Sequence, residues 1–447
     1  MTSAPSDATG DTKSSPRERR AAVIGAGPMG LAAAHELGRR GYRVVVFEAD
    51  DRIGGMSAAF DFDGLQLERY YHFICRPDQP LFDVLAEFGL IDRLRWRSTE
   101  MGFFYNGKLY DWGRPDCLLR FPHLGMVDKL RYAAHVMYTK SVRDWTALDR
   151  VEATTWLRKW VGERAYQVLW HKLFALKFFE HYDKLSAAWI GTRIKRVALS
   201  RKSLFQEELG YLDGGSQVLL DAYRQRIEAV GGEFRLRSPV QRVAVEGGRV
   251  RGVVVRDELH PAEVVLSTIP LKYVPRIAPD LTEDERQRIA AIENIGVVCV
   301  LFKLSKPLTK YFWMNTNDVR IEVPGMIEYS NLNPLPAHVL YVPYYMPKSH
   351  PKWSWDSAQF IEEAKRYVKM VQPSWDERTL LATHASRYEF AQTVCPPGFS
   401  RALPPMQTSV KGFAIADTSY YYPEDRSISE SVRVGKDVSR VVLEDAA

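Results

Sequence analysis

The stretch from Ala21 to Gly55 constrains the fold more than any other part of this 447-residue chain. A short apolar run leads into the spacing G-x-G-x-x-G, which is filled by Gly25, Gly27 and Gly30. We predict that Gly25 permits a tight turn, Gly27 lets the backbone approach a pyrophosphate, and Gly30 lets a helix pack closely on the strand. The stretch therefore predicts the start of a dinucleotide-binding domain.

The residues that follow extend this pattern. A helix is predicted over about residues 28–40, with Pro28 and Met29 in its first turn and its positive N-terminal end facing a phosphate group. A second strand over residues 42–47 ends at Glu48, which can accept hydrogen bonds from the ribose hydroxyls of an adenosine. An arginine at this place would indicate a 2′-phosphate. The expected cofactor is therefore FAD or NAD.

A cation and two glycines follow the acid, in the order Arg52-Ile53-Gly54-Gly55. Here the chain resembles the flavin amine oxidase superfamily, which includes protoporphyrinogen oxidases and phytoene desaturases and, more distantly, UDP-galactopyranose mutase. In these families an R-x-G-G segment runs along the pyrophosphate toward the isoalloxazine ring. The resemblance implies FAD as the cofactor. It places the following residues of the segment beside it: Ala49, Arg52, Gly54, Gly55 and Met56.

Two later stretches carry the same resemblance. The Pro239-Val240 step matches a strand that passes the adenine, so Val240 is expected there. The run over 412–417 ends in Asp417, which is expected to bind the ribitol, and Ile428 begins a helix whose positive end faces the flavin. The implied fold class is α/β, with a Rossmann-like FAD-binding domain of the glutathione reductase type.

The length suits two domains, the second being an α+β substrate domain inserted into the first. A polar tail at residues 1–20 is expected to be disordered. The FAD-binding domain is predicted from residues 21–60, 207–270 and 405–447, and the substrate domain from residues 61–206 and 271–404.

The first insertion begins with a predicted hairpin over 58–69, turning at Asp63-Gly64. We interpret residues 96–203, rich in tryptophan and in cations such as Lys177 and Arg196, as helical, with an aromatic core and a solvated basic face. The alternatives are a lid over a large apolar substrate and a face that rests on an anionic membrane surface.

The second insertion is predicted to hold strands over 296–304, 324–329 and 338–345 and a helix over 357–370. Amine-oxidising members of the superfamily carry a lysine in the strand that matches 296–304. Cys299 stands at that place here. The resemblance therefore points to oxidation of a substrate other than a simple amine.

His72 is the candidate catalytic residue. It follows Tyr70 and Tyr71, which stand where many members of the superfamily have two glycines beside the flavin. The pKa range of an imidazole would suit proton exchange with a substrate. A hydrogen-bonded structural histidine is the alternative.

Composition excludes several classes. A net charge of +6 is too mild to indicate a nucleic-acid partner, and no apolar run reaches the roughly 18 residues of a membrane span. The four cysteines are scattered without metal-site spacing, so we expect no metal, buried free thiols and a cytoplasmic location. The oligomeric state is not indicated.

Three functions compete at this point. The leading one is an FAD-dependent oxidoreductase, in which a small-molecule substrate, apolar or glycosylated, gives a hydride to flavin N5. The second is a non-redox sugar mutase resembling UDP-galactopyranose mutase, with Arg76, Arg193 and Arg196 holding a diphosphate. The third is a non-catalytic scaffold of the GDP-dissociation-inhibitor type.

Overall fold

The computed structural model describes residues 18–446. Most of the predicted tail, residues 1–17, lies outside the described residues, and Arg20 already begins the first strand. The N-terminal hairpin of the first insertion is confirmed, with strands β3 (Ala59–Phe62) and β4 (Leu65–Glu68) joined at Asp63 and Gly64.

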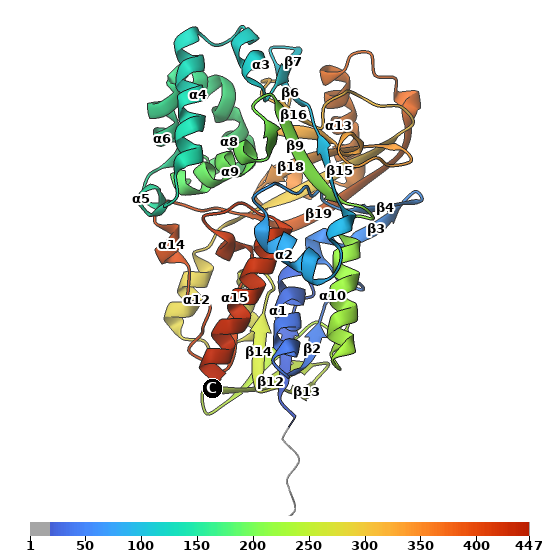
Figure 1. The fold of residues 1–447 in the computed structure, drawn as a ribbon. Helices are drawn as coiled ribbons and strands as arrows, with labels where there is room; N and C mark the ends of the chain where they lie inside the picture. Colours follow the sequence, from blue (N-terminus) through green and yellow to red (C-terminus); the bar gives the residue numbers. More distant parts are fainter. Residues whose placement is uncertain (1–17, 447) are drawn as a thin grey trace, which may run out of the picture.

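A five-stranded parallel sheet forms the lower half of the molecule (Figure 1). Its strands are short and mostly buried, as expected when helices cover both faces. They come from well-separated stretches of the chain, and the predicted α/β fold is confirmed. The spatial order is β10 (Glu233–Arg235), β2 (Arg43–Phe47), β1 (Arg20–Ile24), β14 (Val264–Ser267) and β20 (Phe413–Ile415).

Helix α1 (Pro28–Arg39) follows the glycine-rich turn and packs between α10 (Gln217–Ala229) and α15 (Ile428–Ala446). A Cβ atom at Gly435 of α15 would lie 2.4 Å from the carbonyl oxygen of Met29, so glycine is what lets α15 approach α1. Helix α2 (Gln79–Glu87) packs on α15 in turn. The C-terminal helix is thereby fixed against the turn that follows β1.

The Pro239-Val240 step, expected within a strand, lies instead between two strands, so this expectation was wrong. Arg237 adopts a positive φ of 49°, and Pro239 has no N–H to donate to a sheet. The strand therefore breaks, and only β10 of this stretch joins the parallel sheet. The rest forms a separate antiparallel sheet of β11 (Arg242–Glu246), β12 (Arg249–Val255) and β13 (Glu258–Pro261).

A seven-stranded sheet organises the upper half, where α13 (Ser357–Val371) packs on two of its strands (Figure 1). Along its central strand, Val298 and Val300 join the apolar cluster under α13, whereas Val297 and Cys299 join the cluster on the other face. The order is β19 (Leu380–Thr393), β15 (Asn294–Leu304), β18 (His338–Met346), β17 (Gly325–Glu328), β16 (Trp313–Thr316), β6 (Met101–Tyr105) and β7 (Lys108–Trp112).

The interpretation of residues 96–203 as wholly helical is wrong at its start. β6 and β7 form a hairpin around Asn106 and Gly107, both with positive φ, which is the turn chemistry that an Asn-Gly pair supplies. Before it, β5 (Leu94–Ser98) pairs with β9 (Gln206–Leu212), which also pairs with β8 (Arg201–Ser203).

Helices occupy the rest of this insertion and connect the later strands. In the insertion they are α3 (Pro115–Arg120), α4 (Met126–Ser141), α5 (Thr146–Asp149), α6 (Ala153–Val161), α7 (Glu163–Tyr166), α8 (Lys172–Phe178) and α9 (Ala187–Leu199). The short helices α11 (Val274–Ile277), α12 (Glu283–Ala290) and α14 (Phe399–Ala402) follow later. The solvated basic face is wrong for Lys177 and Arg196, because Lys177 is buried and the Arg196 side chain is only 11% exposed.

Candidate functional site

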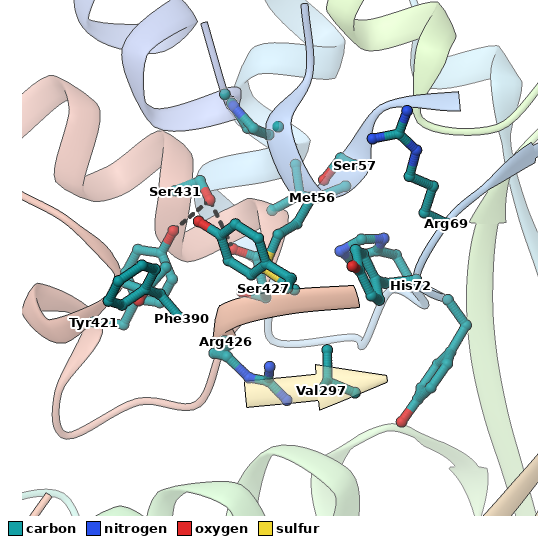
Figure 2. Close-up of a pocket in the computed structure, with 18 of the residues that line it drawn as sticks. Met56, Ser57, Arg69, His72, Val297, Phe390, Tyr421, Arg426, Ser427 and Ser431 are labelled. Carbon is teal, nitrogen blue, oxygen red and sulfur yellow. Dashed lines mark hydrogen bonds between the residues drawn. The ribbon is translucent and has the colours of Figure 1, made fainter. Parts of the chain in front are cut away.

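A cavity of about 410 Å³ lies where the parallel sheet meets the seven-stranded sheet. One part of its wall comes from the turn after β1, represented by Gly27. Another comes from the substrate domain, represented by Val297 and Tyr345. Figure 2 shows His72, Met56, Val297 and Arg426 around this one space. The cavity therefore joins the predicted nucleotide site to the insertions.

The glycine-rich turn has the geometry that its spacing predicts. Gly25 has a φ of +101°, and a Cβ atom at Gly30 would lie 2.0 Å from the Gly25 carbonyl oxygen, so both positions require glycine for close packing. A Cβ atom at Gly27 would meet nothing within 4 Å. Gly27 thus opens onto free space, at the N-terminus of α1, where backbone amides and the helix dipole favour a phosphate.

Glu48 stands at the end of β2 and in the wall of the cavity. One carboxylate oxygen accepts a hydrogen bond from the Ala26 amide at 2.7 Å, and the other accepts one from the Asp50 amide at 2.9 Å. Each oxygen keeps a further acceptor position. The carboxylate is therefore fixed in place and able to accept hydrogen bonds from two ribose hydroxyls.

Asp417 closes the same site from the other end of the sheet, after β20. It is buried and accepts hydrogen bonds from the Leu271 amide at 2.9 Å and the Ser419 amide at 2.8 Å. Burial raises the pKa of this carboxyl, and the two amides oppose that rise. Ile428, the first residue of α15, also lies in the wall. The helix N-terminus thus reaches the cavity beside Asp417.

The predicted site residues divide between the wall and its surroundings. Those that line the cavity are Gly25, Gly27, Pro28, Met29, Glu48, Gly55, Met56, His72, Asp417 and Ile428. Those outside the lining are Gly30, Ala49, Arg52, Gly54 and Val240.

Arg52 bonds within its own segment rather than lining the cavity. Its guanidinium donates to Asp51 at 2.8 Å and to the Ala59 carbonyl at 3.1 Å. Arg69, which sequence reasoning missed, is the cation of this part of the wall, and it lies 3.6 Å from the carboxylate of Asp50. Arg69 directly follows the β3–β4 hairpin. The sequence does not show that this hairpin brings Arg69 back to the glycine-rich turn, so the position of its side chain could not be predicted.

His72 is hydrogen-bonded and faces the cavity. Its Nδ1 contacts the Glu68 carboxylate, whose other oxygen accepts a hydrogen bond from the Ser216 amide at 2.9 Å. Within residues 18–446 its Nε2 has no hydrogen-bond partner. The ring is therefore oriented by a buried acid, with one nitrogen left for a ligand.

Aromatic side chains form much of the wall on the substrate side, among them Tyr70, Tyr71, Trp313 and Tyr345. Cys299 lies in this wall as well, because alternate residues of β15 face it. Burial raises the pKa of the Cys299 thiol well above its usual range, so the group stays neutral. The surface suits an apolar substrate body.

Of three cations in this part of the wall, Arg193 was considered only in the mutase alternative, and Lys177 and Arg426 were not predicted as site residues. Lys177 comes from α8, Arg193 from α9 and Arg426 from the segment before α15. Lys177 is only 4% exposed. The one signal in the sequence is that this lysine sits in the aromatic run Phe174 to Phe179 rather than among polar residues. Such a signal shows burial but does not show which cavity the side chain enters.

The site fits an FAD molecule. Open space at Gly27 leaves room for the pyrophosphate, and Glu48 retains acceptors for the ribose. The wall continues from there to Asp417 and Ile428. Residues 18–446 contain no grouping of three or more His, Cys, Asp or Glu side chains suited to a metal ion. Across the same residues, no helix has the length and apolar character needed to cross a bilayer.

Comparisons with known proteins agree on one class. The family model described as flavin containing amine oxidoreductase matches residues 30–443. The chain is 23% identical over 323 residues to the 15-cis-phytoene desaturase of Synechococcus elongatus, covering 65% of this chain and 66% of that protein. It is 25% identical over 268 residues to the 15-cis-phytoene desaturase of Capsicum annuum, covering 55% and 46%. The aligned stretches thus span about half to two thirds of these relatives.

The fold has solved counterparts. An oxidoreductase from Methanosarcina mazei superposes with a TM-score of 0.73 at 17% identity, covering 94% of this chain and 100% of that one. At this identity the likeness concerns the fold alone.

Proposed function

Because this chain belongs to the family of flavin-containing amine oxidoreductases, whose cofactor is FAD, we propose that it is an FAD-dependent oxidoreductase acting on an organic small molecule. The observation that carries the proposal is the single cavity lined by both the turn at Gly27 and the aromatic wall at Tyr345. When bound, FAD supplies the hydride acceptor at its N5 atom. Family membership favours this redox chemistry over the mutase and scaffold alternatives.

The residues of the parallel sheet bind and orient the cofactor. The Gly27 backbone and the N-terminus of α1 hold the pyrophosphate, and Glu48 accepts hydrogen bonds from the ribose hydroxyls. Asp417 holds the ribitol, while the N-terminus of α15 places positive potential beside the ring. These groups are fixed by backbone hydrogen bonds before any ligand arrives, which lowers the cost of reorganisation.

The residues of the substrate domain exclude water and manage a proton. Tyr71, Trp313 and Tyr345 surround an apolar substrate body and keep the reacting carbon dry. His72, oriented by Glu68, holds or accepts a proton at Nε2. Cys299, which stands where amine-oxidising members of the superfamily carry a lysine, supports a substrate other than a simple amine.

Anaerobic titration tests the proposal. Purified protein reconstituted with FAD is expected to be yellow, and a panel of apolar alcohols, unsaturated lipids and glycosides should contain one member that bleaches it stoichiometrically. A colourless protein that takes up no FAD contradicts the proposal. Substrate conversion that requires pre-reduced flavin and shows no net electron transfer would instead establish the mutase alternative.

The role of His72 is tested in the same experiment. In His72→Ala, bleaching by the true substrate should slow by about 100-fold, the lower range for loss of a general acid or base. FAD content should stay unchanged, because His72 contacts Glu68 and none of the residues that are proposed to hold the pyrophosphate. Normal bleaching in this variant would make His72 a structural residue.

A patch on α3 and α4 supports peripheral contact with an anionic membrane. Leu119, Met126, Val127, Leu130 and Met137 are each more than half exposed, at the edge of the molecule remote from the parallel sheet (Figure 1). Nearby cations such as Arg120 and Arg131 would complement anionic lipid.

Vesicle co-sedimentation tests this contact. Val127→Glu with Leu130→Glu should reduce binding to phosphatidylserine vesicles by about tenfold or more. The control is Val319→Glu, because Val319 is 88% exposed outside the patch. Equal binding by both variants would contradict the contact.

The cellular compartment is proposed from the thiols. Cys75, Cys117, Cys299 and Cys395 are all buried and unpaired, as the sequence predicted. Free thiols persist in a reducing compartment, which supports a cytoplasmic location. Reaction of unfolded protein with a thiol reagent should give four equivalents when it is purified from the cytoplasm without reductant.

A further inference from the structure

The substrate end of the cavity holds more buried positive charge than its carboxylates can neutralise. Arg193 donates to the Asp425 carboxylate at 2.9 Å, and this ion pair is largely buried. Lys177 and Arg426 line the same end, and neither lies within ion-pair distance of a carboxylate among residues 18–446. Three cations therefore face one acid.

Lys177 is the clearest case of an unpaired group. Its ammonium lies 5.1 Å from the ring centroid of Trp189, 5.4 Å from that of Tyr345 and 5.6 Å from that of Phe178. In the described part of the chain it donates no hydrogen bond. Aromatic faces attract a cation but do not replace the acceptors that an ammonium has in water. A buried charge of this kind is costly unless a partner is supplied.

Further donors lie at the same end. Arg426 donates from one terminal nitrogen to the Ala391 carbonyl and from the other to the Tyr345 hydroxyl at 3.2 Å, while its Nε has no partner. The Tyr71 hydroxyl also makes no hydrogen bond within residues 18–446. Burial raises the pKa of Tyr71, which keeps the hydroxyl protonated as a donor.

Of the other cations in the wall, Arg196 and Arg69 face carboxylates, whereas Arg387 is exposed and donates to the Trp355 carbonyl at 2.6 Å. Arg196 makes two hydrogen bonds to Asp78, at 2.9 and 2.8 Å, and Arg69 lies beside Asp50. Apart from the exposed Arg387, the cations of the wall without a carboxylate partner among the described residues are thus Lys177 and Arg426. Lys177 belongs to the substrate domain, and Arg426, from the segment before α15, donates to Tyr345 of that domain, so both lie at the substrate end of the cavity.

We propose that the substrate carries an anionic oxygen group, a carboxylate or a phosphate, that is bound by Lys177 and Arg426 at the substrate end of the cavity. The proposal rests on the proposed function in that it assigns this end to the substrate. The anion supplies acceptors and negative charge that Asp425 alone does not, because one carboxylate oxygen of Asp425 accepts from Arg193 and the other, buried without a hydrogen-bond partner among the described residues, lies beyond ion-pair distance of Lys177 and Arg426. The substrate is then amphipathic, with its apolar body against the aromatic wall.

Anion binding is coupled to a proton. Burial lowers the pKa of Lys177 well below its usual range, Arg193 and Arg426 lower it further, and Asp425 and the Cys395 thiol oppose them. Tyr345 also faces the ammonium across its ring. Burial therefore shifts the proton equilibrium of Lys177 toward the neutral amine, and binding of an anion shifts it back toward the ammonium.

Calorimetric titration of the FAD-saturated protein with phenyl phosphate and, separately, with benzoate tests the subsite. At least one probe should bind, and the tighter one identifies phosphate or carboxylate as the natural group. Lys177→Met should raise its Kd by about tenfold or more. The matched control is Lys184→Met. Lys184 is an exposed lysine in the loop between α8 and α9, so its removal should leave Kd within about twofold.

Titration in two buffers of different ionisation enthalpy gives the second readout. Wild-type protein should take up protons on binding. Lys177→Arg, which is always charged, should bind without proton uptake. Binding of neither probe, or equal binding by wild type and Lys177→Met, overturns the subsite.

These outcomes are separable from failure of the proposed function. If anions bound through Lys177 but no substrate bleached the flavin, the subsite proposal would stand and the proposed redox function would fail. If a neutral substrate bleached the flavin equally well in wild type and in Lys177→Met, the redox function would stand and the anion subsite would fail.

Discussion

The two ends of the cavity hold their charged groups in opposite ways. At the cofactor end, Glu48 and Asp417 each accept hydrogen bonds from two backbone amides. At the substrate end, Lys177 and Arg426 extend long side chains toward the cavity and find no carboxylate. One end is complete without a ligand, and the other is not.

This difference follows from what each end has to bind. The sheet and the helix N-termini hold the backbone amides in fixed positions. Such amides suit FAD, which is the same ligand in every catalytic cycle. Long side chains can be exchanged without altering the fold, so they suit a substrate that differs among relatives. We therefore expect FAD binding at the cofactor end to be sensitive to any local substitution. Ligand binding at the substrate end should be sensitive to charge and pH.

The largest effect is expected from Glu48→Arg. The change removes the acceptor of two backbone amides and places a cation against the turn. The two ribose hydrogen bonds that Glu48 would accept contribute about 1.5–3 kcal/mol each, so FAD affinity should fall by more than about 100-fold. Equilibrium dialysis with FAD measures it.

The control for this variant is Glu246→Arg, which reverses an exposed acid on the separate antiparallel sheet. It should retain FAD fully. If Glu48→Arg retained FAD as well, the cofactor end would not depend on its carboxylate, and the comparison would fail there.

The next effect concerns Lys177 and the pH dependence of stability. The folded protein lowers the pKa of Lys177 below its ordinary value of 10.5. The unfolded chain therefore binds more protons than the folded protein in the pH window between the folded-state pKa and 10.5. The free energy of unfolding should therefore rise with pH in that window, by at most about 1.4 kcal/mol per pH unit from this group, and level off above 10.5.

Lys177→Met should abolish this contribution and be more stable than wild type at neutral pH, because the desolvation cost disappears. Denaturant unfolding at several pH values measures it, with Lys184→Met as the matched control. A slope that is the same in wild type and Lys177→Met would mean that the ammonium is not desolvated.

The same contrast explains what the sequence could predict about the fold. The turn at Gly25 to Gly30 was predictable because only glycine fits its geometry, so the constraint is local. The hairpin at Asn106-Gly107 carried a local signal too, but the surrounding aromatic and basic residues suit an amphipathic helix equally well. Strand pairing with β16 decides the matter, and that contact lies about 200 residues away in the chain.

The site divides in the same manner. Glu48 was predictable because it directly follows β2, at the edge of the parallel sheet where side chains gather, and Asp417, two residues after β20, was expected from the resemblance. Lys177 was not, because its burial depends on α9 and β18 packing against α8. Arg426 lies in a segment without regular structure, so no periodicity places it.

A smaller effect is expected from Arg69→Met, which removes the one side-chain cation of the wall beside Glu48 and Asp50. FAD affinity should fall by about 1.5–3 kcal/mol, the range for a hydrogen bond to a charged group. Dialysis at low and high salt measures it. Unchanged affinity would mean that backbone amides alone hold the pyrophosphate, which would sharpen the contrast between the two ends.

The smallest effect is expected from Arg52→Ala. The side chain is 39% exposed, pairs with the equally accessible Asp51 and stands outside the cavity lining. Exposed pairs contribute about 0–1 kcal/mol, so FAD affinity should change by less than about fivefold. The comparison with Arg69→Met, made in the same dialysis experiment, decides which arginine serves the cofactor. If Arg52→Ala lost more FAD than Arg69→Met, the R-x-G-G segment would reach the phosphates in the bound state, and the cofactor end would depend on a mobile side chain as the substrate end does.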